Sequence, residues 1–361
     1  MAQVIKVLVV DDSPLIRALL KEIINSQPDM EVVGEAADPY EARSAIKALN
    51  PDVLTLDVEM PRMDGITFLR NLMRLRPMPV IMISTLTQKG SQVTLDALEI
   101  GALDYVPKPS GDLREGLDEL ADAIRAKVRM AARVSPDTLA LRQKRLESWQ
   151  NRSAPEVAKR ATSGRQFPSD SCKLIALGAS TGGLDALTTV LSGLGENVPG
   201  IVMTQHIPAG FSASFAARLN GKLPLEVLEA REGLEVLPGR AILAEGDHHL
   251  RVEWTGQGYI CRLDQGAKVS RHRPSVDVLF ESVAQAAGKH AIAALLTGMG
   301  EDGARGMLKL KQAGAWTIAQ DEASSVVWGM PGAAVRLGAV REVKSLDEIA
   351  RSLLAWAHQH A

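Results

Sequence analysis

Apolar runs alternate with amphipathic stretches over about the first 125 residues of the chain. Apolar residues at helical spacing predict helices, for example over residues 15–24 and 42–49. The runs between the helices predict strands at 4–10, 31–35, 53–56, 80–83 and 104–106. Strands that are apolar almost throughout and alternate with helices indicate a parallel sheet covered on both faces. We therefore expect a doubly wound α/β domain with five strands over residues 1–124.

A second series of apolar runs follows from Lys173 onward. Parallel-type strands are predicted at 174–177, 200–205, 291–296 and 316–320. Residues 225–263 are less regular and contain turn signals such as Pro238-Gly239, which predict an inserted β-hairpin. The sequence thus predicts a second doubly wound, Rossmann-like α/β domain over residues 171–361.

The stretch between the two series, residues 125–170, differs in composition. Basic residues accumulate there, few apolar residues recur, and prolines interrupt it at positions 136, 155 and 168. This pattern predicts a linker, with its first half as the candidate for a helix. Its only aromatic residues are Trp149 and Phe167. A solvated tether is therefore favoured over a nucleic-acid arm, in which aromatic residues alternate with basic ones.

Length and composition agree with two soluble α/β domains. A chain of 361 residues is long enough for two cores, and a formal charge of −2 gives no case for nucleic acid as a partner. The two cysteines, Cys172 and Cys261, do not form a metal-binding or disulfide pattern. The apolar N-terminal run is too short for a signal peptide, and no stretch of about 18 apolar residues is present. We expect a cytoplasmic protein without direct membrane insertion.

Polar side chains gather at the carboxyl ends of the first domain's strands, where ligands bind in open parallel sheets. Asp11 and Asp12 follow the first strand, and Asp57 follows the third. Ser84 ends the fourth strand and Lys108 follows the fifth. Three carboxylates at one edge repel one another unless a hard cation such as Mg²⁺ is bound, and a carboxylate there can accept a phosphoryl group. Solvated acidic loops are the weaker interpretation, because four strand ends contribute.

Three motifs in this half resemble those of a response-regulator receiver domain, which has a flavodoxin-like fold. They are Val9-Val10-Asp11-Asp12-Ser13, Thr55-Leu56-Asp57-Val58-Glu59-Met60-Pro61-Arg62-Met63-Asp64-Gly65 and Tyr105-Val106-Pro107-Lys108-Pro109. The resemblance implies that Asp57 is the phosphoacceptor. It further implies that Mg²⁺ is held by Asp11, Asp12, Asp57 and the backbone carbonyl of Glu59. Phosphate readout is implied for Ser84, Tyr105 and Lys108.

The second domain contains a serine in a turn between a strand and a helix expected from Asp185. Gly178-Ala179-Ser180-Thr181-Gly182 matches the G-x-S-x-G pattern, in which backbone N–H groups at a helix start stabilise a developing anion. His206 ends the strand at 200–205, and Asp302 follows the strand at 291–296. Strand-end geometry therefore predicts a triad of Ser180, His206 and Asp302 as nucleophile, base and orienting acid. The backbone near Met299 and Thr181 is the candidate oxyanion site.

Several other residues compete for these roles. Asp277 is a rival acid, although Arg271 and Arg273 offer it a structural salt bridge, and Glu301 neighbours Asp302. His272 is a candidate for lining the cleft. Asp247, His248 and His249 are adjacent residues of types that bind metals, which is weak support for a metal site.

Other classes of protein fit the turn less well. An α/β-hydrolase has the order serine, acid, histidine, whereas this chain has serine, histidine, aspartate. A short-chain dehydrogenase needs a tyrosine four residues before a lysine, and the only tyrosine of this half, Tyr259, is followed there by Leu263. Two non-enzyme interpretations are a signalling adaptor and a DNA-binding output. The second half is not basic enough for DNA and contains no recognition-helix pattern.

The combined motifs resemble the chemotaxis response-regulator methylesterases over nearly the whole chain. The motifs of the second half are Gly178-Ala179-Ser180-Thr181-Gly182-Gly183, Gln205-His206-Ile207-Pro208, Arg271-His272-Arg273-Pro274-Ser275-Val276-Asp277 and Leu296-Thr297-Gly298-Met299-Gly300-Glu301-Asp302-Gly303. The resemblance implies a phosphorylation-activated serine hydrolase that demethylates glutamate methyl esters and deamidates glutamines on methyl-accepting chemoreceptors. It implies a chemotaxis histidine kinase as phosphodonor, no cofactor for the esterase reaction, and an unphosphorylated receiver that covers the catalytic cleft.

Overall fold

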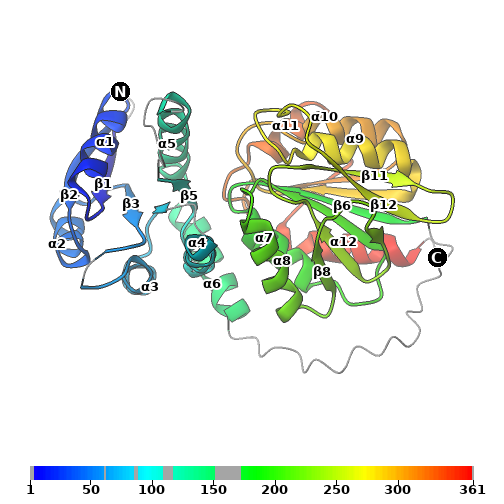
Figure 1. Ribbon diagram of the computed structural model, residues 1–361, viewed down its shortest axis with the longest axis horizontal. Helices are drawn as coiled ribbons and strands as arrows, with labels where there is room; N and C mark the ends of the chain where they lie inside the picture. The colour runs from blue at the N-terminus through cyan, green and yellow to red at the C-terminus, as the bar shows by residue number, and fades with distance from the viewer. Residues whose placement is uncertain (1–3, 61, 85–87, 109–116, 151–171, 360–361) are drawn as a thin grey trace. The chain divides into compact units, whose positions relative to one another are not determined.

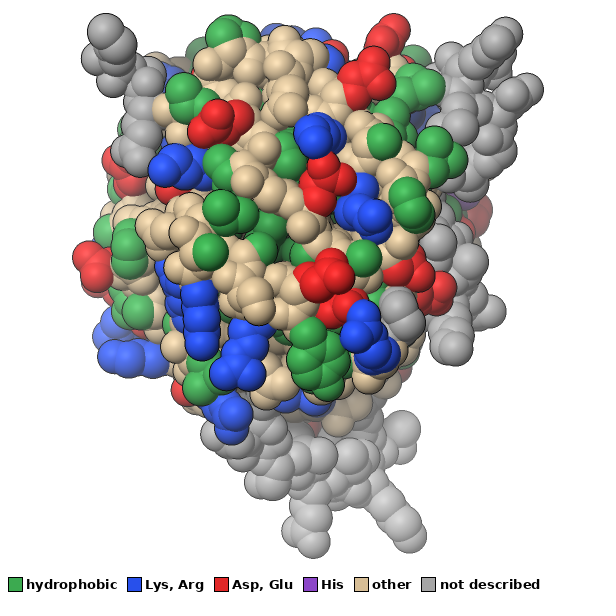
Figure 2. Space-filling model, turned by 90° about the vertical axis from the view of Figure 1, so that its left-hand side faces the viewer, with side chains coloured by type: hydrophobic (Ala, Val, Ile, Leu, Met, Phe, Trp, Pro, Cys, Tyr) green, Lys and Arg blue, Asp and Glu red, His purple; other side chains and the backbone are tan. Residues whose placement is uncertain are grey.

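The computed structural model describes residues 4–60, 62–84, 88–108, 117–150 and 172–359. The chain forms two compact units, Met1–Trp149 and Gln150–Ala361. Among the described residues, no helix is both long and apolar enough to cross a bilayer. On the face drawn in Figure 2, acidic and basic side chains are interspersed with apolar ones.

The first unit is built on a five-stranded sheet in the order β2-β1-β3-β4-β5, with every neighbouring pair parallel. The strands are β1 Ile5–Val10, β2 Met30–Ala36, β3 Val53–Asp57, β4 Val80–Ser84 and β5 Asp104–Pro107. Both the five strands and the doubly wound, flavodoxin-like order confirm the prediction. β3 and β4 are buried along their whole length, as expected for central strands covered on both faces.

Helices α1 to α4 connect these strands, and α5 and α6 follow the last one (Figure 1). They are α1 Pro14–Asn25, α2 Pro39–Leu49, α3 Gly65–Leu75, α4 Gln88–Ile100, α5 Leu117–Ala131 and α6 Pro136–Gln150. Their starts follow local chemistry: the side chains of Ser13, Asp38 and Asp64 accept hydrogen bonds from N–H groups in the first turns of α1, α2 and α3.

Helix α6 lies within the stretch that the sequence assigns to the linker, and α5 continues past residue 124. The buried Arg142 of α6 donates hydrogen bonds from Nη1 to Gly101 O (2.7 Å) and from Nη2 to Leu98 O (3.2 Å) and Ala102 O (3.0 Å). These carbonyls lie at the C-terminal end of α4, where a helix leaves acceptors without partners of its own. Helix α6 is therefore fastened to the first unit, which extends to Trp149.

The second unit contains a seven-stranded sheet in the order β15-β14-β13-β6-β7-β10-β8, and all of its pairs are parallel. Its strands are β6 Leu174–Ala179, β7 Gly200–Gln205, β8 Glu226–Glu229, β10 Arg240–Leu243, β13 Ala291–Leu295, β14 Trp316–Gln320 and β15 Glu342–Lys344. The predicted α/β class is confirmed. The short strand β15 has no counterpart in the sequence-based prediction.

The prediction of a single hairpin insertion over residues 225–263 is only partly right. An antiparallel sheet forms there from β9 Glu235–Val236, β11 His249–Trp254 and β12 Tyr259–Asp264. Strands β8 and β10 of the same stretch instead join the large sheet in parallel. In the sequence, a short strand beside turn residues has the same pattern whether it belongs to the antiparallel sheet or to the large parallel sheet. The two cases differ only in pairing, since β10 pairs with β7 of the large sheet.

Helices cover both faces of the large sheet: α9, α10 and α11 on one side and α7, α8 and α12 on the other (Figure 1). They are α7 Gly183–Ser192, α8 Phe211–Lys222, α9 Val276–Ala286, α10 Ala304–Gln312, α11 Met330–Arg336 and α12 Leu346–Gln359, with a 3₁₀ turn at Gly288–His290. Helix α7 begins at Gly183, two residues before the predicted start at Asp185.

Strand order decides where the site forms. The chain runs from β6 to β7 on one side, whereas β13 pairs with β6 on its other side. The order therefore reverses at β6, and ligands bind at such a reversal, beyond the carboxyl ends of the strands.

Candidate active site

Ser180 directly follows β6, on a turn whose backbone is fixed on three sides. Its N–H donates to Thr297 O (3.0 Å), and its own carbonyl accepts from Gly183 N–H (2.7 Å) and from Gln205 Nε2 (2.8 Å). Gly182 has a φ of 75°, a left-handed conformation that favours glycine. A Cβ at Gly183 would lie 2.1 Å from Gln205 Oε1, so only glycine allows this approach. The half-buried serine is held at the N-terminus of α7.

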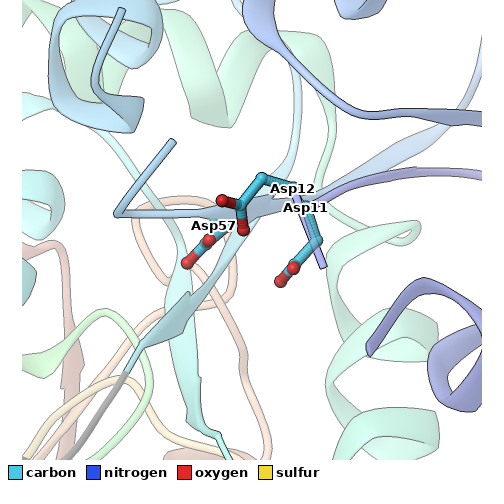
Figure 3. Close-up of side chains that lie close together, drawn as sticks. All are labelled: Asp11, Asp12 and Asp57. Atoms are coloured by element: carbon cyan, nitrogen blue, oxygen red, sulfur yellow. The ribbon is translucent and has the colours of Figure 1, made fainter. Parts of the chain in front are cut away.

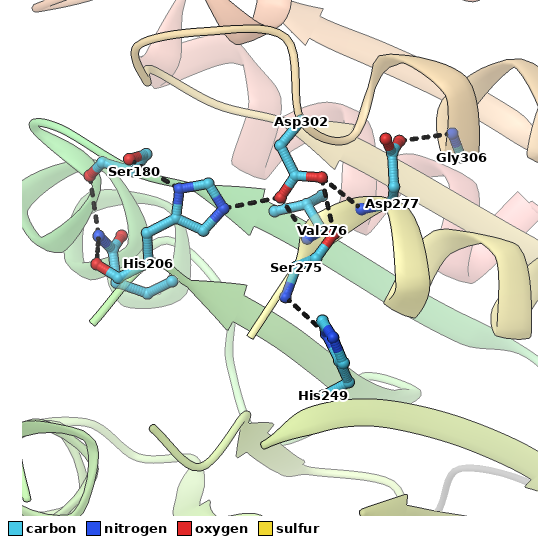
Figure 4. Close-up of polar contacts among 9 residues, drawn as sticks. Ser180, His206, His249, Ser275, Val276, Asp277, Asp302 and Gly306 are labelled. Atoms are coloured by element: carbon cyan, nitrogen blue, oxygen red, sulfur yellow. Dashed lines mark hydrogen bonds and ion pairs between the residues drawn. The ribbon is translucent and has the colours of Figure 1, made fainter. Parts of the chain in front are cut away.

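The imidazole of His206 connects the serine to a carboxylate (Figure 4). Its Nδ1 lies 3.0 Å from Ser180 Oγ, and its Nε2 lies 2.7 Å from Asp302 Oδ2. The His206 N–H donates to Ala179 O (3.2 Å), which holds the histidine beside the end of β6. The three residues that the sequence places at neighbouring strand ends therefore form one chain of hydrogen bonds.

Asp302 is only 1% exposed and lies at the N-terminus of α9. Its Oδ1 accepts from Ser275 Oγ (2.7 Å) and Asp277 N–H (3.1 Å), and its Oδ2 accepts from Val276 N–H (2.7 Å). Burial alone would raise the pKa of Asp302, but the hydrogen bonds from His206, Ser275 and Val276 lower it below the usual value. The carboxylate is therefore kept ionised, with one oxygen directed at His206.

The rival acid Asp277 has a different position. It is buried in the first turn of α9 and accepts a hydrogen bond from Gly306 N–H (2.7 Å). Burial raises its pKa to about 6. The expected salt bridge from Arg273 is absent, because Arg273 pairs with Asp247 (2.8 Å). Glu301, the other rival, is exposed and lies 3.5 Å from Arg305.

The sequence Asp247-His248-His249 does not form a metal site. Among the described residues, the acidic cluster of the first unit is the only group of three or more ligands close enough to share an ion. The ring of His249 is buried between Ala267 O (3.0 Å from Nε2) and the N–H of Ser275 (3.2 Å from Nδ1). Both nitrogens therefore support the loop before α9.

Sequence reasoning did not single out Ser275 or Gln205. Ser275 precedes a helix, so a capping role was the available signal. Its hydroxyl points instead to a carboxylate 27 positions away in the chain. Gln205 was quoted only as part of a motif, and nothing in its local sequence indicates that its side chain bridges Ser180 O and His206 O (3.1 Å).

The two candidate oxyanion donors lie on different loops, Met299 after β13 and Thr181 after β6. A Cβ at Gly298 would come within 2.8 Å of Ser180 Cβ, so the loop after β13 runs directly alongside the serine. Within the described parts of the chain, the N–H of the adjacent Met299 has no hydrogen-bond partner. Thr181, the second candidate, is buried, and its carbonyl accepts from Thr297 Oγ1 (3.0 Å).

The acidic cluster of the first unit is assembled at the ends of β1 and β3 (Figure 3). Carboxylate oxygens of Asp11, Asp12 and Asp57 lie within 4.8 Å of one another. Asp11 and Asp57 are buried, whereas Asp12 is exposed. Lys108 Nζ bridges the buried pair, 3.0 Å from Asp11 Oδ2 and 2.9 Å from Asp57 Oδ1.

Asp57 has the environment of a reactive carboxylate. Burial raises its pKa to about 6, against the opposing effect of Lys108. Its Oδ2 is buried and has no hydrogen-bond partner in the described parts of the protein. An orphaned carboxylate oxygen in a group of three carboxylates fits a hard divalent cation.

The other residues predicted for the phosphorylation site differ in burial and in the groups that they contact. Ser84 is buried and accepts a hydrogen bond from Thr94 Oγ1 of α4 (2.9 Å). Tyr105 is half-buried, and Lys127 Nζ lies over its ring, 5.3 Å from the centroid. The backbone of Glu59 forms a hydrogen bond with the Asp57 carboxyl that lowers the pKa of Asp57. The ligand role of the Glu59 carbonyl stays a prediction.

Together, the fold and the two sites define a class: a response regulator whose output unit has the hydrogen-bonded serine, histidine and aspartate of a serine hydrolase. The model of the response regulator receiver domain matches residues 7–121, and the model of the CheB methylesterase matches residues 175–353. The chain belongs to the family of protein-glutamate methylesterases/protein-glutamine glutaminases.

Similarity to individual proteins supports this assignment. The chain is 58% identical over 354 residues to protein-glutamate methylesterase/protein-glutamine glutaminase 1 of Hahella chejuensis, covering 98% of this chain and 97% of that one. It is 52% identical over 362 residues to the protein of the same name in Xanthomonas euvesicatoria, covering 98% of each. The crystal structure of the Thermotoga maritima CheB methylesterase catalytic domain is 37% identical, with a TM-score of 0.50, and covers 51% of this chain and 98% of that domain.

Proposed function

We propose that the second unit hydrolyses glutamate methyl esters on methyl-accepting chemoreceptors, with Ser180, His206 and Asp302 as the catalytic residues. The observation that carries the proposal is the continuous hydrogen-bond chain from Ser180 Oγ through both ring nitrogens of His206 to Asp302. A serine hydroxyl is a weak nucleophile by itself and needs a base at hydrogen-bond distance, which Nδ1 of His206 supplies.

In the first half of the reaction, Ser180 Oγ bonds to the ester carbonyl carbon while its proton passes to His206 Nδ1. The negative charge that develops on the carbonyl oxygen is stabilised by the N–H of Met299, with the backbone near Thr181 as a second donor. Removing one such donor typically lowers turnover by about 10²- to 10³-fold. The bond to the methoxy oxygen then breaks, and His206 returns its proton to give methanol.

In the second half, water attacks the acyl-enzyme and His206 accepts its proton. Collapse of this intermediate breaks the bond to Ser180 Oγ, which regains the proton, and a glutamate carboxylate is released. Asp302 stabilises the imidazolium that forms in both halves and keeps the ring in the productive tautomer. Glutamine deamidation requires the same groups, with ammonia in place of methanol. Neither reaction requires a cofactor.

The first unit supplies regulation in this proposal. Asp57 is the phosphoacceptor, and Mg²⁺ would be held by Asp11, Asp12, Asp57 and the carbonyl of Glu59. When bound, Mg²⁺ neutralises the charge of the carboxylates and of the incoming phosphoryl group. Lys108, Ser84 and Tyr105 then read the phosphoryl group, which adds about −1.5 to −2 charges. A chemotaxis histidine kinase is the expected phosphodonor, and we expect the encounter to occur in the cytoplasm.

The decisive measurement is methanol release from methylated chemoreceptor membranes, with and without a small phosphodonor plus Mg²⁺. We expect release from the wild-type chain to rise with the phosphodonor, release from Asp57→Ala to stay at the basal level, and Ser180→Ala to release none. Esterase activity that survives in Ser180→Ala would exclude the proposed nucleophile. No release from folded wild-type protein under any condition would favour the signalling adaptor instead.

A further inference from the structure

His272 lies in the loop between β12 and α9, and its backbone is fixed. The N–H of Val269 donates to His272 O (3.0 Å), and the N–H of His272 donates to Val269 O (2.9 Å). The next residue, Arg273, pairs with Asp247 and donates from Nη1 to Gln265 O (2.9 Å) and Gly266 O (2.9 Å). This loop is therefore a rigid support rather than a free surface segment.

The ring of His272 lies flat on the ring of His206. The two centroids are 3.6 Å apart, and the planes differ by 11°. At this distance the faces are in van der Waals contact over most of their area. His272 is half-buried and the side chain of His206 is only 7% exposed, so His272 covers the ring of His206 from the edge of the site.

The stacked ring supplies a restraint that the hydrogen bonds of His206 do not. Those bonds are made at two edges of the imidazole, through Nδ1 and Nε2. They fix the ring within its plane, but they resist tilting about the line through the two nitrogens only weakly. The terminal torsion of histidine is broad, so it adds little resistance. A flat neighbour 3.6 Å away blocks this tilt on one side.

We propose that His272 is a positioning residue for the esterase reaction, which holds the ring of His206 in line between Ser180 and Asp302 through face-to-face stacking. The inference rests on the proposed function of the triad. It concerns the orientation of the base and assigns His272 no bond to substrate. A base that tilts away from the serine lowers the rate of the chemical step and leaves substrate binding nearly unchanged.

Two substitutions separate stacking from other roles. His272→Phe keeps a flat aromatic face and removes the nitrogens, whereas His272→Leu keeps apolar volume and removes the flat face. Both are made in the full chain and assayed with phosphodonor and Mg²⁺ for methanol release. The rate at which Ser180 is labelled by a fluorophosphonate probe reports the serine and its base without the receptor. Circular dichroism confirms that each variant is folded.

We expect His272→Leu to lower kcat and the labelling rate by about 10- to 100-fold with KM changed less than about twofold. We expect His272→Phe to keep kcat within about threefold of wild type. Wild-type activity in folded His272→Leu would overturn the proposal. So would a His272→Phe variant as slow as His272→Leu, which would assign the role to the ring nitrogens, or a change confined to KM. If the wild-type chain itself neither releases methanol nor is labelled, the proposed function fails, independently of His272.

Discussion

Asp57 is a charged side chain that the fold of the first unit disfavours. Burial raises its pKa from 3.8 to about 6, so the folded unit binds this proton more tightly than the unfolded chain does. The ionised form therefore destabilises the folded unit. This destabilisation is fully present above about pH 6 and is lost as the pH falls towards the ordinary pKa of 3.8. A difference of about two pKa units corresponds to about 3 kcal/mol.

Asp57→Asn should therefore stabilise the first unit in buffer without Mg²⁺, by about 2–3 kcal/mol at pH 8 and by close to zero at pH 4. Hydrogen exchange of the β3 amides, corrected for intrinsic rates, measures this change. Asp12→Asn is the matched control, because Asp12 belongs to the same cluster but is exposed, and its effect should be smaller. Equal gains at both pH values would contradict this account of Asp57.

At the residue scale, the sequence predicts those site residues that strand ends determine. Ser180, His206 and Asp302 each follow a recognisable apolar run, and parallel strands bring those ends to one edge. Ser275 and the stacking of His272 depend on how a loop of the second unit folds back over the sheet. Side-chain contacts between distant segments are not encoded in any local period or spacing, so no sequence pattern indicated them.

At the element scale, the sequence allows a helix in the first half of the predicted linker, but it does not predict that this helix, α6, packs onto the first unit. The segment of α6 is rich in basic residues and begins with a proline, and both features are typical of a linker. The guanidinium of Arg142 is buried and bound to three carbonyls at the end of α4, and Leu139 and Leu146 of α6 are buried as well. Helix α4 also carries Thr94, which donates a hydrogen bond to Ser84 beside the phosphoacceptor strand. The helix that leads out of the receiver is thus connected to the residue proposed to read the phosphate.

Arg142→Ala should release α6 from α4, because the carbonyls lose charged donors that are worth about 1.5–3 kcal/mol each in favourable cases. We expect amide hydrogen exchange in α6 to speed up by at least about tenfold, with little change in β1 and β3. Lys144→Ala is the control, since Lys144 lies on the same helix but is exposed. Unchanged exchange in Arg142→Ala would show that other contacts hold the helix.

At the scale of the whole molecule, the position of α6 changes how the two units are separated experimentally. A cut after residue 140, within the linker that the sequence predicts over residues 125–170, falls inside α6, which ends at Gln150. A fragment that begins at residue 151 lacks the whole first unit, including its last helix, α6. Because the unphosphorylated receiver is expected to cover the catalytic cleft, this fragment should release methanol several times faster than the full chain without phosphodonor.

The comparison uses equal concentrations of fragment and full chain, and the Ser180→Ala fragment as the blank. Phosphodonor and Mg²⁺ should activate the full chain and leave the fragment unchanged, because the fragment lacks Asp57. A folded fragment that is no faster than the unphosphorylated full chain would count against a covered cleft. Activation would then have to depend on something that the first unit adds.

The first turn of α9 has an evolutionary consequence. Ser275, Val276 and Asp277 all donate hydrogen bonds to the carboxylate of Asp302, so the turn and the aspartate are complementary to each other. Replacement of Asp302 alone during evolution would leave three buried hydrogen-bond donors without an acceptor. Replacement of Ser275 alone would remove one hydrogen bond from the buried carboxylate of Asp302. Natural variation at positions 275 and 302 should therefore be correlated. Descendants that have lost the esterase activity should drift at both positions together.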